Sequence, residues 1–218
     1  MIIAIEGNIG SGKSTILKEL EKMNYNPSQV VFLQEPVAEW LDIKLGDKNA
    51  LELFYENQKE NSFWFQILAY ITRLRNLLSI LENNPQDKII ICERSIYTDK
   101  YVFAKMLYES GNISEIEWIT YSYWFDTFKK QTKLDLILYV NTEPEECFNR
   151  IIKRNRVEEI NKISKEYLIN CHDKHTEWFK EKDMNTKIFH INGKDTVENI
   201  MTFVKHIICD IIISKNLQ

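Results

Sequence analysis

The chain has 218 residues, of which 44% are hydrophobic and 28% charged, and its formal net charge is -4. These values are typical of a single globular domain with its own core, and they exclude a disordered chain. The acidic balance argues against a nucleic-acid polymer as partner, because such binders need a cationic surplus, although a small anionic ligand in a local basic pocket stays possible. No apolar stretch approaches the roughly 20 residues of a membrane span. Four cysteines without a CxxC pair, and no targeting leader, predict a cytoplasmic protein.

Five short apolar runs alternate with longer helical patterns along the chain. The runs are Ile2–Ile5, Val30–Leu33, Lys88–Cys92, Leu134–Val140 and Lys187–Ile191. Continuous apolar runs of this length predict strands buried on both faces, as in a parallel sheet. Their alternation with helical patterns predicts one α/β domain over residues 1–218, with helices crossing between the strands.

Three helical patterns stand out between and after these runs. Ser62–Leu81 is apolar almost all round, so we expect a largely buried helix. Glu115–Phe128 carries so many aromatic side chains that it belongs in the core or in a subunit interface. Thr196–Ile212 has apolar residues at helical spacing and predicts an amphipathic C-terminal helix.

A phosphate-binding motif follows the first run directly. Residues 7–14 read GNIGSGKS, which matches GxxxxGK[ST], and a helical pattern follows them. Glycines let backbone N–H groups surround phosphate oxygens, the lysine adds a point charge, and the final hydroxyl can bind Mg²⁺. We therefore expect a nucleoside triphosphate to bind residues Gly7, Asn8, Ile9, Gly10, Ser11, Gly12, Lys13, Ser14 and Thr15.

Carboxylates and an arginine follow the second and third runs. Glu35 comes after the second run, which we expect beside the first strand, so its carboxylate would point into the ligand crevice and could accept a proton from a hydroxyl. Glu93 and Arg94 come after the third run, where the acid could hold Mg²⁺ through water and the arginine could bridge acceptor and phosphates. A solvated glutamate and a surface ion pair are the alternatives.

Polar residues on the long apolar helix suggest a site for a nucleobase. Gln66 and Arg73 lie seven residues apart, hence on one helix face, and Asp99 could pair with Arg73. Such a set would suit the polar edge of a base, with Trp40, Phe65 or Phe103 stacking on it. A purely structural ion pair is the alternative.

A basic cluster could close over the phosphates as a lid. Arg150, Lys153, Arg154 and Arg156 follow one another on a predicted helix edge. The alternative is an ordinary solvated charged face.

Taken together, these segments resemble the deoxyribonucleoside kinases of the deoxycytidine/deoxyguanosine kinase type. The matching segments are GNIGSGKST, EPVAEW, Tyr55 with Phe65, Gln66 and Arg73, ERSIYTDKYVFA, YESGNISEIEW, and RIIKRNRVEE with the downstream EYL and HDKHTEW. The resemblance implies a doubly wound, five-stranded parallel sheet with a helical lid at about residues 150–166. It also implies a homodimer, Mg²⁺, and transfer of the γ-phosphoryl group of ATP or another triphosphate to the 5′-hydroxyl of a deoxyribonucleoside.

The resemblance also implies individual roles. Glu35 would be the general base, Arg94 would contact the 5′-hydroxyl and the transferred phosphate, and Glu93 would assist Mg²⁺ with Ser14. Lys13 would hold the donor phosphates, Arg154 and Arg156 would stabilise transition-state charge, and Arg150 would lie nearer the donor base. Tyr55 and Glu159 would hold the sugar 3′-hydroxyl, and Gln66 would bind the base.

The pair Arg73 and Asp99 resembles the arrangement that favours deoxycytidine and purine deoxynucleosides over thymidine.

The residues leave two other functions open. A deoxynucleoside monophosphate kinase of the thymidylate kinase type would want an arginine in or near the loop, and residues 8–11 contain none. A non-catalytic P-loop regulator would not need Glu35, Arg94 and the Gln66, Arg73 and Asp99 set together.

Overall fold

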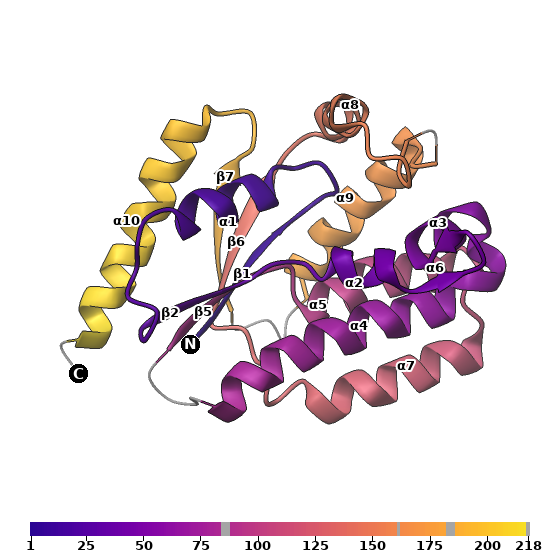
Figure 1. Ribbon diagram of the computed structural model, residues 1–218, viewed down its shortest axis with the longest axis horizontal. Helices are drawn as coiled ribbons and strands as arrows, with labels where there is room; N and C mark the ends of the chain where they lie inside the picture. The colour runs from indigo at the N-terminus through magenta and orange to yellow at the C-terminus, as the bar shows by residue number, and fades with distance from the viewer. Residues whose placement is uncertain (84–87, 161, 182–185, 217–218) are drawn as a thin grey trace.

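The computed structural model describes residues 1–83, 88–160, 162–181 and 186–216. At its centre lies a five-stranded sheet in the order β2-β5-β1-β6-β7 (Figure 1). All four neighbouring pairs are parallel, with Ile3 of β1 opposite Ile91 of β5 and Leu136 of β6. The expected parallel sheet is therefore confirmed, and each apolar run overlaps a strand: β1 Ile2–Gly7, β2 Val30–Leu33, β5 Ile89–Glu93, β6 Leu136–Asn141 and β7 Lys187–Asn192.

Helices cover both faces of this sheet, as a doubly wound fold requires (Figure 1). They are α1 Lys13–Glu21, α2 Val37–Asp42, α3 Ala50–Glu56, α4 Gln58–Asn83, α5 Ile96–Thr98, the π-helix η1 Asp99–Ala104, α6 Lys105–Glu109, α7 Glu115–Phe128, α8 Pro144–Arg154, α9 Lys165–Phe179 and α10 Val197–Asn216. A small antiparallel hairpin, β3 Lys44–Leu45 with β4 Lys48–Asn49, separates α2 from α3. None of the helices in the described residues combines the length and apolar character that a bilayer span requires.

Local sequence explains several helix ends. Asn49 and Glu52 form a reciprocal capping box at the start of α3, and Ser114 with Glu117 does the same for α7. Pro144 occupies the first turn of α8, and Asn155 ends that helix in a left-handed conformation with φ 56°. The left-handed conformation of Asn155 fixes where the chain leaves α8.

The core has one cluster on each face of the sheet. Leu17 of α1 and Val204 of α10 pack on one face, and Val102 of η1 and Trp178 of α9 pack on the other. Each fully buried side chain of this size contributes about 1.5–3 kcal/mol. A third cluster joins α4 to α2, α3 and α7 beyond the edge of the sheet, where Phe65 lies. The two helix layers and this cluster do not cover the carboxyl ends of the strands, which stay accessible to a ligand.

Three expectations need correction or refinement. The second strand does not lie beside the first, because β5 is inserted between β2 and β1. Helix α4 is not buried all round, since the side chain of Ile71 is 51% exposed. Helix α7 buries Tyr121 and Phe125 but leaves Tyr123 76% exposed, so it serves the core on one side only. The C-terminal helix α10 is amphipathic as predicted.

Candidate active site

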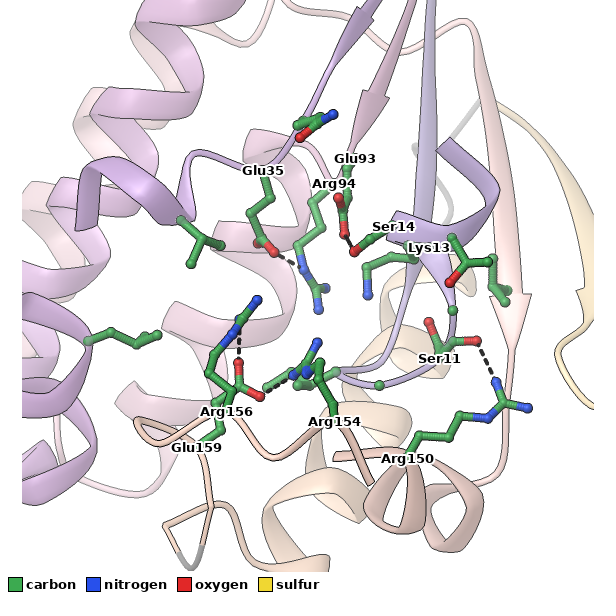
Figure 2. Close-up of a pocket in the computed structure, with 18 of the residues that line it drawn as sticks. Ser11, Lys13, Ser14, Glu35, Glu93, Arg94, Arg150, Arg154, Arg156 and Glu159 are labelled. Atoms are coloured by element: carbon green, nitrogen blue, oxygen red, sulfur yellow. Dashed lines mark hydrogen bonds and ion pairs between the residues drawn. The ribbon is translucent and has the colours of Figure 1, made fainter. Parts of the chain in front are cut away.

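A cavity of about 850 Å³ lies at the carboxyl ends of β1, β2 and β5, a size suited to small ligands. It brings together every predicted site residue except Gly7 and Asn8. The residues that line it are Ile9, Gly10, Ser11, Gly12, Lys13, Ser14, Thr15, Glu35, Trp40, Tyr55, Phe65, Gln66, Arg73, Glu93, Arg94, Asp99, Phe103, Arg150, Arg154, Arg156 and Glu159. Residues from distant parts of the chain therefore face one space (Figure 2).

The phosphate loop joins β1 to the N-terminus of α1. Gly10 has φ 77°, and a Cβ there would lie 2.6 Å from the carbonyl oxygen of Cys147, so glycine is required. Asn8 supports the loop from behind: its side chain accepts from the N–H of Ile9 at 2.8 Å and donates to the carbonyl of Leu168 at 2.7 Å. The loop is thus held open toward the cavity.

Lys13 is the charged group of this loop. Its Nζ donates to the carbonyl oxygen of Asn8 at 2.6 Å, and its side chain is buried. Burial, with help from the nearby charge of Arg94, lowers the pKa of Lys13 to about 8. A bound phosphate would restore the charged form, because an anion in this position stabilises the ammonium group.

Ser14 and Glu93 provide oxygen ligands suited to Mg²⁺. The Ser14 hydroxyl donates to Oε1 of Glu93 at 2.5 Å (Figure 2). In the part of the chain that the structure describes, no group of three or more His, Cys, Asp or Glu residues could hold a metal. This sparse set of hard oxygens fits Mg²⁺, which takes its remaining ligands from water and substrate phosphates.

Glu35 meets two arginines at the centre of the cavity. Nη2 of Arg73 and Nε of Arg94 each lie 3.1 Å from the same oxygen, Oε1. Figure 2 shows the contact between Glu35 and Arg94. Burial alone would raise the pKa of Glu35, but Arg94, Arg73 and Lys13 outweigh it and lower the pKa to about 2. The carboxylate is therefore ionised at neutral pH, and Oε2 receives no hydrogen bond from the described residues.

Arg73 forms the predicted ion pair with Asp99. Nε of Arg73 lies 2.9 Å from Oδ2 of Asp99, and Nη2 lies 3.3 Å from Oδ1. Nη1 of Arg73 also donates to the carbonyl oxygen of Glu93 at 3.0 Å. Both side chains are buried, so water does not compete for these hydrogen bonds and the opposite charges hold the pair in place.

Aromatic rings and one amide surround the same end of the cavity. Phe65 lies between Phe54, with ring centroids 4.5 Å apart, and Trp40, at 5.5 Å. Phe103 lies under the guanidinium group of Arg94 at 4.9 Å. Gln66 is buried, and its amide has no hydrogen bond to any described residue. The polar edge and ring faces of a base could be satisfied here.

The end of α8 and the segment after it bring two arginines, Arg154 and Arg156, over the cavity. Glu159 forms ion pairs with both Arg154 and Arg156, the latter at 2.6 Å between Nη1 and Oε1 (Figure 2). Burial, and then the negative charge of Glu159, raises the pKa of Tyr55, which keeps the phenol protonated. Asn161, within the expected lid, lies outside the described residues.

Arg150 has a different position from these two arginines. Its Nη1 donates to the carbonyl oxygen of Ser11 at 3.1 Å and its Nη2 to that of Gly193 at 2.8 Å. It therefore links the phosphate loop to the turn after β7. Sequence reasoning missed that turn, where Gly193, Asp195 and Val197 line the cavity. Their only signal was their place after a predicted parallel strand.

Comparison with known proteins agrees with this geometry. The family model "Deoxynucleoside kinase" matches residues 3–211. Deoxycytidine kinase 2 of Gallus gallus is 36% identical over 202 residues, which cover 84% of this chain and 75% of the relative. Deoxycytidine kinase of Mus musculus is 36% identical over 204 residues, covering 84% and 77%. Mitochondrial deoxyguanosine kinase of Xenopus laevis is 33% identical over 198 residues, covering 83% and 73%. These relatives do not favour the thymidylate-kinase-like alternative, and the chain belongs to the deoxynucleoside kinase family of enzymes.

Proposed function

We propose that the protein transfers the γ-phosphoryl group of ATP, or of another nucleoside triphosphate, to the 5′-hydroxyl of a deoxyribonucleoside. Its substrates are deoxycytidine, purine deoxynucleosides, or both, and its product feeds nucleotide salvage. The observation that carries this proposal is the position of Glu35, whose carboxylate shares one cavity with the phosphate loop and the arginines of the lid. A regulator that only bound a nucleotide would have no use for that carboxylate.

Glu35 acts as the general base. Arg73 and Arg94 hold its Oε1, so Oε2 accepts the proton of the 5′-hydroxyl as the hydroxyl oxygen attacks phosphorus. A carboxylate with a pKa of about 2 is a weak base, but it is never lost to protonation at neutral pH. It therefore orients the hydroxyl and takes up its proton as the bond to phosphorus forms, with the charge of Arg94 drawing the phosphoryl group toward it.

Cationic side chains stabilise the transferred phosphoryl group. Lys13 and the loop hold the β- and γ-phosphates, and Arg154 and Arg156 approach from the opposite side of the cavity (Figure 2). Ser14 and Glu93 would hold Mg²⁺, partly through water, and the bound ion would neutralise charge between the phosphates. Arg150 lies nearer the donor base.

The acceptor sits between the lid and α4. Tyr55 and Glu159 bind the sugar 3′-hydroxyl, and the arginines on Glu159 keep its carboxylate in place. The side-chain amide of Gln66 donates a hydrogen bond to the base and accepts one from it. The faces of the base contact Phe65, Trp40 and Phe103.

Asp99 and Arg73 set the base preference. Cytosine and adenine present an amino group that can donate a hydrogen bond to the Asp99 carboxylate, whereas thymine carries a methyl group that neither cytosine nor a purine has. Because a buried charged pair penalises a base that cannot satisfy it, thymidine should be a poor substrate.

A panel of four deoxynucleosides with ATP and Mg²⁺, scored by kcat/KM, tests this assignment. We expect kcat/KM for thymidine to be lower than that for the best substrate by about 100-fold or more. A clear thymidine preference would overturn the reading of Arg73 and Asp99. Absence of phosphorylation of all four would overturn the proposed reaction itself.

We also propose that two copies associate through α4 and α7, which lie side by side at one edge of the molecule (Figure 1). The outer face of α7 presents Ile116, Ile119, Tyr123 and Trp124, and α4 adds Ile71, with exposed fractions between 49% and 76%. Exposed apolar side chains on two neighbouring helices are typical of a homodimer interface. The single-domain organisation and the cytoplasmic location stay predictions from sequence.

A further inference from the structure

A buried carboxylate in the central strand takes no part in the reaction described above. Glu6 is the penultimate residue of β1 and is completely buried. Burial raises its pKa to about 7, which shows how poorly the site suits a charge. Central parallel strands are otherwise apolar on both faces, and a leucine or valine would suit the core better. A residue that breaks the local pattern in this way calls for a function.

Two hydroxyl groups converge on the Glu6 carboxylate. Oγ of Ser95 donates to Oε1 at 2.6 Å, and Oγ1 of Thr98 donates to Oε2. Ser95 also caps α5, since its Oγ accepts from the N–H of Thr98 at 3.4 Å. A carboxylate can accept both hydroxyl hydrogens at once, which no apolar side chain could do. Glu6 therefore ties β1 to the turn between β5 and η1.

The first residue of that turn is Arg94, and the neighbours of Glu6 in β1 hold it too. The N–H of Arg94 donates to the carbonyl of Ile5 at 3.0 Å, and Nη1 donates to the carbonyl of Gly7 at 2.9 Å. Three consecutive residues of β1 thus anchor the segment that carries the arginine. Arg94 has φ 62°, a left-handed conformation that costs a non-glycine residue about 1 kcal/mol and persists only where its surroundings enforce it.

We propose that Glu6 is a positioning residue for phosphoryl transfer. By fixing Ser95 and Thr98, it keeps Arg94 in the left-handed conformation that directs the guanidinium group between Glu35 and the phosphate loop. The inference rests on the proposed role of Arg94. It goes beyond that role because it assigns a catalytic consequence to a residue that touches neither substrate.

Thr98→Val tests the inference with the smallest change in shape. The variant removes one hydroxyl from the Glu6 carboxylate and keeps the β-branched side chain. We expect kcat to fall by about 10- to 100-fold, as a misplaced catalytic group implies, with KM for nucleoside and ATP within about twofold of wild type. Glu6→Gln can still bond both hydroxyls and should keep kcat within about threefold, whereas Glu6→Leu should match or exceed the Thr98→Val defect. Should Thr98→Val not fold, Ser95→Ala carries the same test.

Thr132→Val is the matched control. Thr132 is equally buried, its hydroxyl bonds the carbonyl of Phe128 and no other group among the described residues, and it does not line the active-site cavity. This variant should lower the melting temperature and leave kcat unchanged. An equal loss of kcat in Thr132→Val and Thr98→Val would reduce the effect to a general loss of stability and overturn the inference.

A double-mutant cycle with Arg94→Ala separates this inference from the proposed function. If Thr98 acts through Arg94, Thr98→Val should lower single-turnover rates in the wild-type background and have no effect in the Arg94→Ala background. A full penalty in both backgrounds, or unchanged kcat in folded Thr98→Val and Glu6→Leu, would overturn the role of Glu6. Near-normal turnover of Arg94→Ala alone would instead contradict the proposed role of Arg94.

Discussion

Replacing Asp99 by asparagine would test how the buried ion pair with Arg73 supports both folding and base selection. The two residues form two hydrogen bonds, and both side chains are almost fully buried. Asparagine has nearly the same shape, but it removes the negative charge and turns one acceptor oxygen into a donor facing the guanidinium group. The substitution therefore changes the charge and the hydrogen bonds while creating no cavity.

The contacts of Arg73 limit the expected cost. Removing one partner of a buried ion pair outright costs about 3–5 kcal/mol. Arg73 keeps Glu35 and the carbonyl of Glu93 in this variant, and one hydrogen bond to residue 99 can persist. Since a hydrogen bond to a charged group contributes about 1.5–3 kcal/mol, we expect the free energy of unfolding to fall by about 2–3 kcal/mol. That corresponds to a melting temperature lower by about 4–12 °C.

Urea unfolding and a substrate panel together make the assay. Asp210→Asn is the control, because Asp210 is 62% exposed and pairs with the exposed His206, and the change should cost less than about 1 kcal/mol. In Asp99→Asn, the ratio of kcat/KM for deoxycytidine to that for thymidine should fall by about tenfold or more. Stability and base selection both equal to wild type would refute the reasoning.

Burial raises the pKa of Glu6 from 4.5 to about 7, so the folded protein retains a proton that the unfolded chain releases. Between about pH 4.5 and 7 the free energy of unfolding of the wild type should therefore fall by up to about 3 kcal/mol relative to that of Glu6→Gln. Urea unfolding at a series of pH values measures both, and the same pH dependence in the two proteins would contradict this prediction. Arg156→Ala should lower kcat by about 100-fold in single-turnover assays, and a change in nucleoside affinity alone would argue against a role in the transition state. Tyr123→Glu should give monomers in light scattering. The control Phe203→Ser, which changes an exposed side chain of α10, should stay dimeric. A monomeric wild type would refute the interface.

The sequence predicted those features that depend on local patterns. The strands followed from apolar runs, and the phosphate loop followed from a contiguous motif whose glycines are required by the backbone, as at Gly10. The pairing of Arg73 with Asp99 also followed, because an isolated arginine on an apolar helix needs a buried partner.

Other features depended on long-range packing. The position of β5 between β1 and β2 depends on where the third strand is inserted, which no local pattern encodes. The π-helix η1 was not predicted, although it carries both Asp99 and Phe103 into the cavity. The turn at Gly193 was missed because its residues carry little chemistry of their own. The exposed side of α4 at Ile71 looked like core because composition alone does not distinguish an exposed apolar side chain from a buried one.

Comparison of Glu35→Gln with wild type tests the central claim most directly. Glutamine keeps an oxygen for Arg73 and Arg94 but cannot take up the proton of the 5′-hydroxyl. Nucleoside affinity, measured by calorimetry in the absence of a donor, should stay within a few-fold of wild type. The single-turnover rate with ATP and Mg²⁺ should fall by about 100- to 10,000-fold. A variant that binds nucleoside normally and turns over at close to the wild-type rate would contradict the assignment of Glu35 as the general base.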